Sequence, residues 1–375
     1  MADPFTGRAT TYDLDVGLML DIEDMFHLLD PYDTPLYGMY GADGRSAISH
    51  GDCFEKKVEW LDEVLLTPRS TLDGSIDDNE TEITVNEPRE HFAVDDIIRV
   101  DEEYMRVTDY GSGDNDLEVE RGWAGSSAAA HDDGDHVVGV GMAPQEGDDP
   151  HDPRMLDRIE RYNYTQIFGP HKVEVSGTEN VVRKYGLGGT TEFDHQAANR
   201  TKEVAVSIEQ AILYGRRYEN QSEKRRTLGG MDYWITENVD DSTTDLTEDA
   251  LLDQMEDIYN KGGIPDRATA GSKQKRKASS FNETQIRYDR SNDMRGQVVE
   301  YFDTDFGRIS FLLNRWVRPS DLFIFSRDQA RLETLRPLVF EMLAKTGDSM
   351  KGQIVCEKTF KFYRQRHAAK FTNLE

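Results

Sequence analysis

Residues 161–178 read Arg-Tyr-Asn-Tyr-Thr-Gln-Ile-Phe-Gly-Pro-His-Lys-Val-Glu-Val-Ser-Gly-Thr, and this stretch says more about the fold than any other. β-Branched and aromatic residues dominate it, which favours extended strands, and Gly169-Pro170 interrupts it. A Gly-rich spacer from Gly186 to Gly189 follows. This order predicts a pair of strands that leads into a long helical segment.

The segment from Thr191 to Tyr218 has the clearest helical pattern in the chain. Thr191 or Asp194 can cap its N-terminus, because both side chains accept hydrogen bonds from free main-chain N–H groups. One stripe follows the helical repeat: Ala197, Thr201, Val204, Ile208, Ala211 and Ile212. Basic residues beyond its C-terminal end complement the helix dipole. We therefore expect one long amphipathic helix.

The composition is that of a folded but strongly acidic protein. Apolar residues make up 37% of the 375 residues, with 16 Phe, 16 Tyr and 4 Trp, which is too many for a disordered chain. The formal net charge is −28, and Arg outnumbers Lys by 29 to 15. The acids occur along the whole chain, so they favour adaptation to high salt over an acidic tail or a nucleic-acid mimic.

The cysteines and the N-terminus exclude several classes of protein. Cys53 and Cys356 have apolar or aromatic neighbours, so we expect buried, reduced thiols and no Cys-based metal site. The N-terminus lacks the basic start and apolar run of a signal peptide, and no processed pro-segment is evident. No stretch approaches the ~20 apolar residues of a membrane span. These features predict a soluble protein made in the cytoplasm.

Residues 71 to 150 form a block with its own composition. The block contains 23 Asp and Glu residues against 4 Arg, so it carries −19 of the net charge of −28. Turn signals such as Asp73-Gly74 and Asp133-Gly134 separate short stretches of strand character. These stretches are Glu82–Val85, Asp96–Val100, Glu103–Thr108, Leu117–Arg121 and His136–Val140. The pattern predicts an inserted all-β module.

Periodicity and helix breakers predict the remaining elements. Helices are expected at Leu20–Leu29, which Pro31 ends, at Thr247–Tyr259, at Ser272–Phe281 and at Leu332–Leu343, where Pro337 breaks or kinks the helix. Strands are expected at Phe54–Leu66, Ile159–Val175 and Leu322–Phe325, with a hairpin at Val298–Asn314. Residues 1 to 19 have the composition of a loose polar arm.

Several phrases resemble, in the same order, segments of the major capsid proteins of tailed double-stranded DNA viruses with the Hong Kong 97-type fold. They are Asp33-Thr-Pro35, Asn163-Tyr-Thr-Gln-Ile-Phe168, Val173-Glu-Val-Ser-Gly-Thr178, Gly229-Gly230 with Tyr233-Trp-Ile235, Phe306-Gly307, Thr346-Gly-Asp348 and Glu357-Lys-Thr359. This resemblance covers residues 20–66 and 155–370. A second resemblance, carried by residues 96–107 and 119–131, relates the block at 71–150 to a small β-barrel insert of some viral structural proteins.

The resemblance implies an α+β fold whose parts have names in the capsid family. Residues 1–50 would form the N-terminal arm and first helix, and residues 51–70 with 151–178 the E-loop hairpin. Residues 71–150 would be the inserted β-barrel-like domain. Residues 179–227 and 296–320 would form the peripheral domain with its spine helix, and residues 228–295 and 321–375 the axial domain and the C-terminal return strands.

The function implied by the resemblance is structural rather than enzymatic. Such a protein self-assembles into hexamers and pentamers, which form the icosahedral head of a tailed virus around packaged double-stranded DNA without sequence-specific binding. Other capsid, portal or decoration proteins are further partners of that kind, and neither a cofactor nor a membrane is implied. Together with the acidity, this indicates a virus of a halophilic archaeon, with the protein made in the host cytoplasm and located in the virion capsid.

The alternative is a halophilic enzyme with an inserted β domain. Against it, the sequence has no Walker A loop, GxSxG elbow, HExxH motif or Cys-based zinc spacing. Gly186 to Gly189 could form a phosphate cradle, but no convincing parallel strand precedes it and no Lys-Ser/Thr pair follows. A flexible hinge before the long helix is the favoured interpretation.

Two charged clusters and the scattered histidines remain as candidate binding residues. The run from His131 to His136 does not match EF-hand spacing. It is interpreted as a solvated turn, with adventitious cation binding by Asp132, Asp133 and Asp135 as the alternative. The basic run Lys273, Lys275, Arg276 and Lys277 could contact nucleic acid, but pairing with acids of a neighbouring subunit is favoured in so acidic a chain. His27, His91 and His195 are expected to be surface or hydrogen-bonded core histidines.

Overall fold

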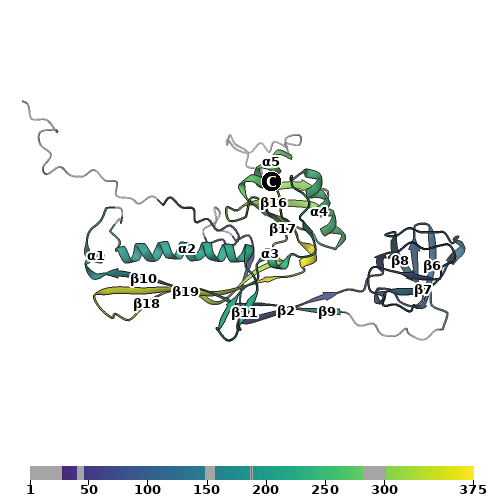
Figure 1. Ribbon diagram of the computed structural model, residues 1–375, viewed down its shortest axis with the longest axis horizontal. Coiled ribbons are helices and arrows are strands. Elements are labelled where there is room, and N and C mark those ends of the chain that lie inside the picture. The colour runs from purple at the N-terminus through teal and green to yellow at the C-terminus, as the bar shows by residue number, and fades with distance from the viewer. Residues whose placement is uncertain (1–27, 40–45, 148–156, 186, 188, 282–300) are drawn as a thin grey trace, which may run out of the picture. The chain divides into compact units, whose positions relative to one another are not determined.

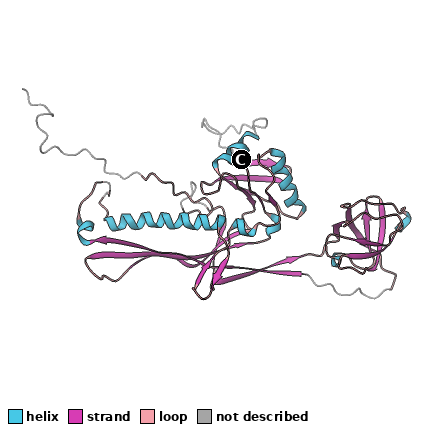
Figure 2. Cartoon of the chain, viewed as in Figure 1, coloured by secondary structure: helices cyan, strands magenta, loops and turns pink. Residues whose placement is uncertain are grey.

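The computed structural model describes residues 28–39, 46–147, 157–185, 187, 189–281 and 301–375 (Figures 1 and 2). The chain divides into two compact units. Unit 1 is Met1–Trp60 together with Tyr162–Glu375, and unit 2 is Leu61–Arg161. The arm predicted at residues 1–19 and most of the helix predicted at Leu20–Leu29 lie outside the described residues.

Unit 1 contains a four-stranded sheet in the order β1-β18-β19-β10. β1 (Ser49–Asp52) runs parallel to β18 (Ala330–Met342), whereas β18 and β10 (Gln166–Ser176) are both antiparallel to β19 (Ser349–Phe362). The phrase Glu357-Lys-Thr359 lies within β19. Gly169-Pro170 falls where the register between β10 and β19 shifts, a place where a strand tolerates Pro because the ladder is already interrupted.

Helix α2 (Glu192–Tyr214) lies along this sheet (Figure 1). Thr191 caps it as predicted, since its side chain accepts a hydrogen bond from the Asp194 N–H at 3.2 Å. Val204, Ile208 and Ile212 of the predicted stripe are fully buried in the main core of unit 1. The long helix is thus confirmed, although it ends at Tyr214 and leads into a hairpin of β11 (Tyr218–Asn220) and β12 (Arg225–Thr227).

The helix predicted at Leu332–Leu343 is wrong, because these residues form most of β18. Leu, Glu and Arg favour helices by intrinsic propensity, but β18 is paired on both sides, with β1 and with β19, and this non-local pairing overrides the propensity. Pro337 lies between Arg336 and Val339, where the register with β19 shifts. The proline therefore marks a bulge in a strand rather than a break in a helix.

A six-stranded sheet in unit 1 has the order β13-β20-β17-β14-β16-β15. Its strands are β13 (Val239–Asp240), β14 (Arg267–Ala270), β15 (Tyr301–Thr304), β16 (Gly307–Leu313), β17 (Leu322–Phe325) and β20 (Ala369–Phe371). The hairpin and the short strand predicted here are confirmed in the described residues. Within it, β16 pairs with β14 on one side and with β15 on the other.

Helices α4 (Glu248–Asn260) and α5 (Ser272–Phe281) pack against the six-stranded sheet, and both confirm predicted helices. Leu251, Met255 and Ile258 of α4 share a core with Phe302 and Phe371 from the strands. Within the described residues, unit 1 also has the short helices α1 (Gly177–Val181) and α3 (Met231–Trp234) and the 3₁₀ turn η4 (Gln365–His367).

Unit 2 contains a six-stranded sheet in the order β3-β8-β5-β6-β7-β4. Its strands are β3 (Arg69–Thr71), β4 (Glu82–Thr84), β5 (Asp96–Val100), β6 (Glu103–Tyr110), β7 (Asp116–Glu120) and β8 (His136–Met142), with 3₁₀ turns η1 (Arg89–His91) and η2 (Trp123–Gly125). A bridge between Leu72 and Val85 joins the two edge strands, so the sheet closes on itself as a small barrel. Its interior is apolar, with Leu72, Ile98, Met105 and Val137 fully buried.

Two further strands, β2 (Lys57–Val64) and β9 (Asp157–Tyr164), pair as a two-stranded ribbon, and the boundary between the units falls within both of them. Ion pairs link them, from Arg158 to Glu63 at 3.2 Å and from Arg161 to Asp62 at 2.8 Å. The strand predicted at Phe54–Leu66 is confirmed, whereas the one predicted at Ile159–Val175 is divided between β9 and β10.

Candidate functional site

The first polar centre of the molecule is Glu209, a fully buried carboxyl group on α2. Oε1 accepts hydrogen bonds from the Leu36 N–H at 3.0 Å and from the Asn314 amide at 2.6 Å, and Oε2 accepts one from the Tyr37 N–H at 2.8 Å. The segment at 33–37 is thereby attached to the long helix. Leu36 of this segment is fully buried.

The groups that donate hydrogen bonds to Glu209 are all neutral, so no positive charge among them offsets the cost of burying its carboxylate. Burial raises the pKa of Glu209 to about 7, because no protein dipole replaces water fully around a buried anion. The hydrogen bonds from Tyr37, Leu36 and Asn314 act in the opposite direction, and the nearby charge of Asp33 raises the pKa further. Asp33 itself is paired with Arg315 at 2.9 Å. The attachment of the 33–37 segment therefore depends on a carboxyl group that titrates near neutrality.

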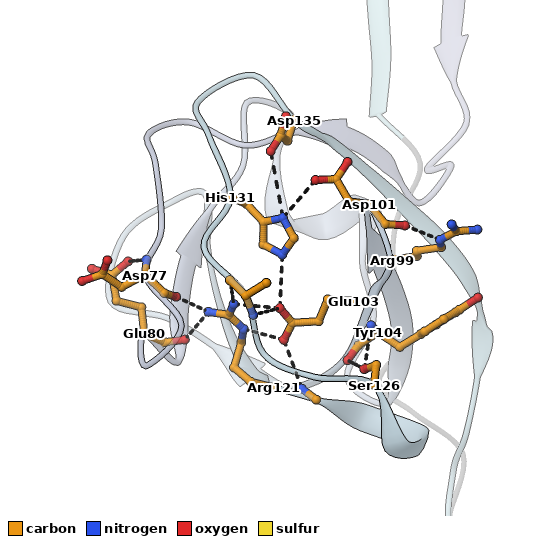
Figure 3. A network of polar contacts seen from close by, with 12 residues as sticks. Asp77, Glu80, Arg99, Asp101, Glu103, Tyr104, Arg121, Ser126, His131 and Asp135 are labelled. Atoms are coloured by element: carbon orange, nitrogen blue, oxygen red, sulfur yellow. Dashed lines mark hydrogen bonds and ion pairs between the residues drawn. The ribbon is translucent and has the colours of Figure 1, made fainter.

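The second polar centre lies inside the barrel of unit 2, around Glu103 (Figure 3). Strand β6 alternates, so Glu103 faces inward with Met105 and Val107. Arg121 approaches Glu103 with two parallel hydrogen bonds, Nε to Oε1 and Nη2 to Oε2, both at 2.8 Å. Arg121 also donates to the carbonyls of Asp77 and Glu80, so it connects β7 with the loop before β4.

Three more groups donate to the Glu103 carboxylate. They are the Gly122 N–H at 3.1 Å, the Ala129 N–H at 3.0 Å and Nε2 of His131 at 3.1 Å. Burial alone would raise the pKa of Glu103, but the hydrogen bonds from Arg121, Ala129, Gly122 and His131 outweigh it and lower the pKa to about 2. Glu103 is therefore ionised at neutral pH, and no motif in the sequence pointed to it.

The structure separates the three acids proposed as a cation cluster. Of the three, Asp135 belongs to a group of side chains that could bind a metal ion, with its Oδ2 at 4.0 Å from Nδ1 of His131. Asp133 instead accepts a hydrogen bond from the Gly74 N–H, and the main-chain N–H of Asp132 donates to Asp135. Residues 132–134 are exposed as expected of a solvated turn, but His131 is buried. A group that could hold a metal ion comprises Asp101, His131 and Asp135.

The basic run on α5 is partly paired within the chain. Lys277 forms an ion pair with Asp245 and donates to the Glu375 main-chain oxygen, and Lys275 donates to the Phe311 carbonyl at 2.8 Å. Lys273 and Arg276 are exposed. The run is therefore not a continuous free basic face, which weakens the nucleic-acid interpretation.

The two cysteines, His91 and His195 behave as structural residues. Cys53 and Cys356 are free and buried, as predicted, and burial raises the pKa of each thiol to about 11. His91 is buried and hydrogen-bonded to the Thr67 carbonyl, and His195 contacts the Asn199 amide on α2. His27 lies outside the described residues.

A model of the SU10 major capsid protein family matches residues 4–375, almost the complete chain. The chain belongs to the SU10 major capsid protein family. A major capsid protein is a structural protein of the virion shell and not an enzyme, so the role is assembly rather than catalysis. No curated protein matches the chain.

Solved structures similar to this capsid protein include proteins of phages. One from Microbacterium phage Oxtober96 has a TM-score of 0.52 at 10% identity, covering 98% of this chain and 100% of that one. One from Gordonia phage Cozz has a TM-score of 0.53 at 8% identity, covering 99% and 97%. The capsid of a native GTA particle has a TM-score of 0.52 at 8% identity, covering 98% and 100%. These likenesses show the fold, a mixed α/β fold of the Hong Kong 97 type.

None of the described helices of the capsid protein is both long and apolar enough to cross a membrane. Helix α2 is too polar for this, and the other helices in the described ranges are too short.

Proposed function

We propose that this capsid protein assembles into hexamers and pentamers that close an icosahedral head around double-stranded DNA. The observation that carries this proposal is an exposed apolar region at one end of the four-stranded sheet. Val181, the last residue of α1, is 81% exposed, and Met342, the last residue of β18, is 58% exposed. The Gly177 N–H donates to the Asp348 carbonyl, which ties the start of α1 to the turn between β18 and β19. Large apolar side chains exposed at one end of a sheet favour a protein partner.

Within this assembly the parts of the chain have the roles of their counterparts in the capsid family. Residues 1–50 are the N-terminal arm and first helix, and residues 51–70 with 151–178 are the E-loop hairpin. Helix α2 is the spine helix of the peripheral domain. The six-stranded sheet with α4 and α5 belongs to the axial domain, so we assign residues 301–313 to it as well.

The experiment is to image the purified protein at high salt by negative stain after size-exclusion chromatography. Shells or capsomers are expected from the wild type. Val181→Ser with Met342→Ser should reduce the yield of shells at least tenfold while leaving a folded subunit. Val140→Ser is the matched control, because Val140 is as exposed as Met342 but lies on β8 of unit 2. Equal yields from both variants, or only discrete wild-type monomers, would contradict the proposal.

We also propose that unit 2 is an inserted module that the shell fold does not need. Its strands enter and leave through the paired ribbon of β2 and β9, so the two ends of the insertion are neighbours, as tolerated insertions require. Replacing residues 72–148 by a short Gly-Ser linker should therefore leave the rest of the chain folded. Far-UV circular dichroism and shell imaging check this, and loss of unit 1 structure would contradict it.

We further infer adaptation to high salt, as for a virus of a halophilic archaeon. Each copy carries a net charge of −28, and a shell repeats that charge at short distances. The Debye length is roughly 30 Å at 0.01 M salt but roughly 3 Å at 1 M, so repulsion between copies is screened only at high salt. Shells should lose integrity as NaCl falls below about 1 M, before the subunits unfold. Light scattering and Trp fluorescence in one titration measure both events, and shells intact in dilute buffer would exclude this adaptation.

A further inference from the structure

Three side chains at one end of the barrel in unit 2 bring ligand atoms together. Asp101 follows β5, His131 follows the loop after η2, and Asp135 precedes β8. One ligand atom from each lies within 4.8 Å of the others. We propose that Asp101, His131 and Asp135 bind a divalent transition-metal cation of the zinc type. This proposal is independent of the assembly proposed above.

The tautomer of His131 is the main argument. Glu103 receives hydrogen bonds on both oxygens, from Arg121 and from main-chain N–H groups, so it is an ionised acceptor. Nε2 of His131 lies 3.1 Å from Glu103 Oε2 and must carry the hydrogen of that bond. In the neutral ring Nδ1 then presents a lone pair, and this lone pair faces the Asp101 and Asp135 carboxylates. Three electron-rich atoms in such contact require a positive charge between them.

The distances suit a metal ion in that place. Zinc binds His nitrogen and carboxylate oxygen at about 2.0–2.2 Å, so neighbouring ligands of a tetrahedral site are about 3.3 Å apart. Nδ1 lies 3.2 Å from Asp101 Oδ2 and 4.0 Å from Asp135 Oδ2. The side chain of Asp135 is 31% exposed, so a small rotation brings it into the shorter range. Asp101 is 66% exposed, which leaves the fourth position open to water.

The surroundings of His131 are those of a metal ligand. Metal-binding histidines commonly donate their other ring N–H to a carboxylate, which fixes the ring, and Glu103 has this role here. The main chain of His131 is held by a bridge to Ile76. The nitrogen ligand favours zinc and its neighbours in the transition series over Ca²⁺ and Mg²⁺, which prefer oxygen ligands alone.

The competing explanation is a proton on Nδ1, which would supply the same charge without a metal. The two are separated by calorimetric titration of the chelator-treated, full-length protein with Zn²⁺, in millimolar Mg²⁺ to occupy nonspecific acidic sites. One Zn²⁺ per chain with micromolar or tighter Kd is expected for the wild type. No stoichiometric binding would overturn the proposal in favour of the proton.

Variants locate the bound ion. Asp101→Asn and Asp135→Asn alter solvent-accessible groups and should each weaken Zn²⁺ binding at least tenfold, with an unchanged circular dichroism spectrum. Asp132→Asn and Asp133→Asn are the matched controls from the same turn and should bind as the wild type does. His131→Gln should abolish binding, although its burial makes the Asp variants the decisive ones. Zn²⁺ binding that survives in the Asp101→Asn/Asp135→Asn double variant would refute the assignment.

Discussion

Glu103 of unit 2 and Glu209 of unit 1 are two buried glutamates that the protein treats in opposite ways. Glu103 faces Arg121 and is surrounded by further donors, so the pKa of its carboxyl group falls to about 2. Glu209 faces only neutral donors, and burial raises its pKa to about 7. Three neutral donors therefore do not offset the burial of Glu209, whereas the bidentate Arg121 guanidinium together with the further donors offsets the burial of Glu103.

Both carboxyl groups nevertheless have the same structural task. Each connects segments that are far apart in the sequence: Glu103 and Arg121 join strands β6 and β7 to the loop at 77–80, and Glu209 joins α2 to the segment at 33–37 and to Asn314. The connection in unit 2 is insensitive to pH near neutrality, and the connection in unit 1 is not.

The largest expected effect follows from removing the cation of unit 2. Arg121→Met leaves Glu103 as a buried, unpaired charge, which should lower the free energy of unfolding of unit 2 by about 3–5 kcal/mol. Urea denaturation followed by Trp123 fluorescence measures it, since Trp123 is the tryptophan of this unit. The control is Arg99→Met, whose exposed pair with Glu102 should contribute no more than about 1 kcal/mol. Equal losses would mean that the pairing of Glu103 is not what stabilises the barrel.

A smaller loss is expected when the carboxyl group of unit 1 is removed. Glu209→Ala leaves the Leu36 and Tyr37 N–H groups and the Asn314 amide without their acceptor, which should cost about 2–4 kcal/mol. Far-UV circular dichroism in urea measures the change. Glu203→Ala, an exposed position on the same helix, should change stability by less than about 0.5 kcal/mol. A tolerated Glu209→Ala would show that the 33–37 segment is held by packing alone.

The sharpest test of the comparison is pH, because the two groups predict slopes of opposite sign. The folded-state pKa of Glu103 is below its unfolded value of about 4.3, so its contribution is present above that pH and is lost as the pH falls toward 2. The folded-state pKa of Glu209 is above the unfolded value, so its contribution is present below about pH 4.3 and is lost as the pH rises toward 7. Each slope can reach about 1.4 kcal/mol per pH unit.

Glutamine variants separate these two slopes. Glu103→Gln should remove the loss of stability at acid pH, and Glu209→Gln should remove the loss between about pH 4.3 and 7. Urea denaturation of the wild type and both variants over this pH range provides the measurement. If Glu209→Gln leaves the slope near neutrality unchanged, Glu209 is already ionised in the folded protein at acid pH and the contrast with Glu103 disappears.

Local patterns in the sequence predicted much of the fold. Helix α2 and the barrel strands follow from the spacing of Val204, Ile208 and Ile212 and from alternation in segments such as β6. Strand β18 could not be predicted in this way, because its pairing partners β1 and β19 are set by tertiary contacts rather than by its own residues.

The two polar centres, around Glu103 and Glu209, were harder to predict from the sequence than the strands and helices that carry them. The sequence pattern places Glu103 on the inward face of its strand, at the alternating positions that Met105 and Val107 also occupy. It likewise places Glu209 on the buried side of helix α2, between Ala205 and Ile212. The hydrogen-bond partners of both glutamates could not be predicted from local patterns, because Leu36 is 173 residues from Glu209 and Arg121 is 18 residues from Glu103. The run from His131 to His136 signals an acidic turn, but nothing in its pattern shows that the His131 side chain is buried against Glu103.

The bridge between Leu72 and Val85 has a consequence for a protein displayed in many copies. A row of unpaired N–H and C=O groups at the rim of a sheet acts as a template on which other strands polymerise. The Asn86 N–H donates to Thr71 and the Asp73 N–H to Thr84, so the two outermost strands of unit 2 saturate one another. The module can therefore be crowded at high local concentration without offering its neighbours a place to add a strand, which protects against fibrous aggregation.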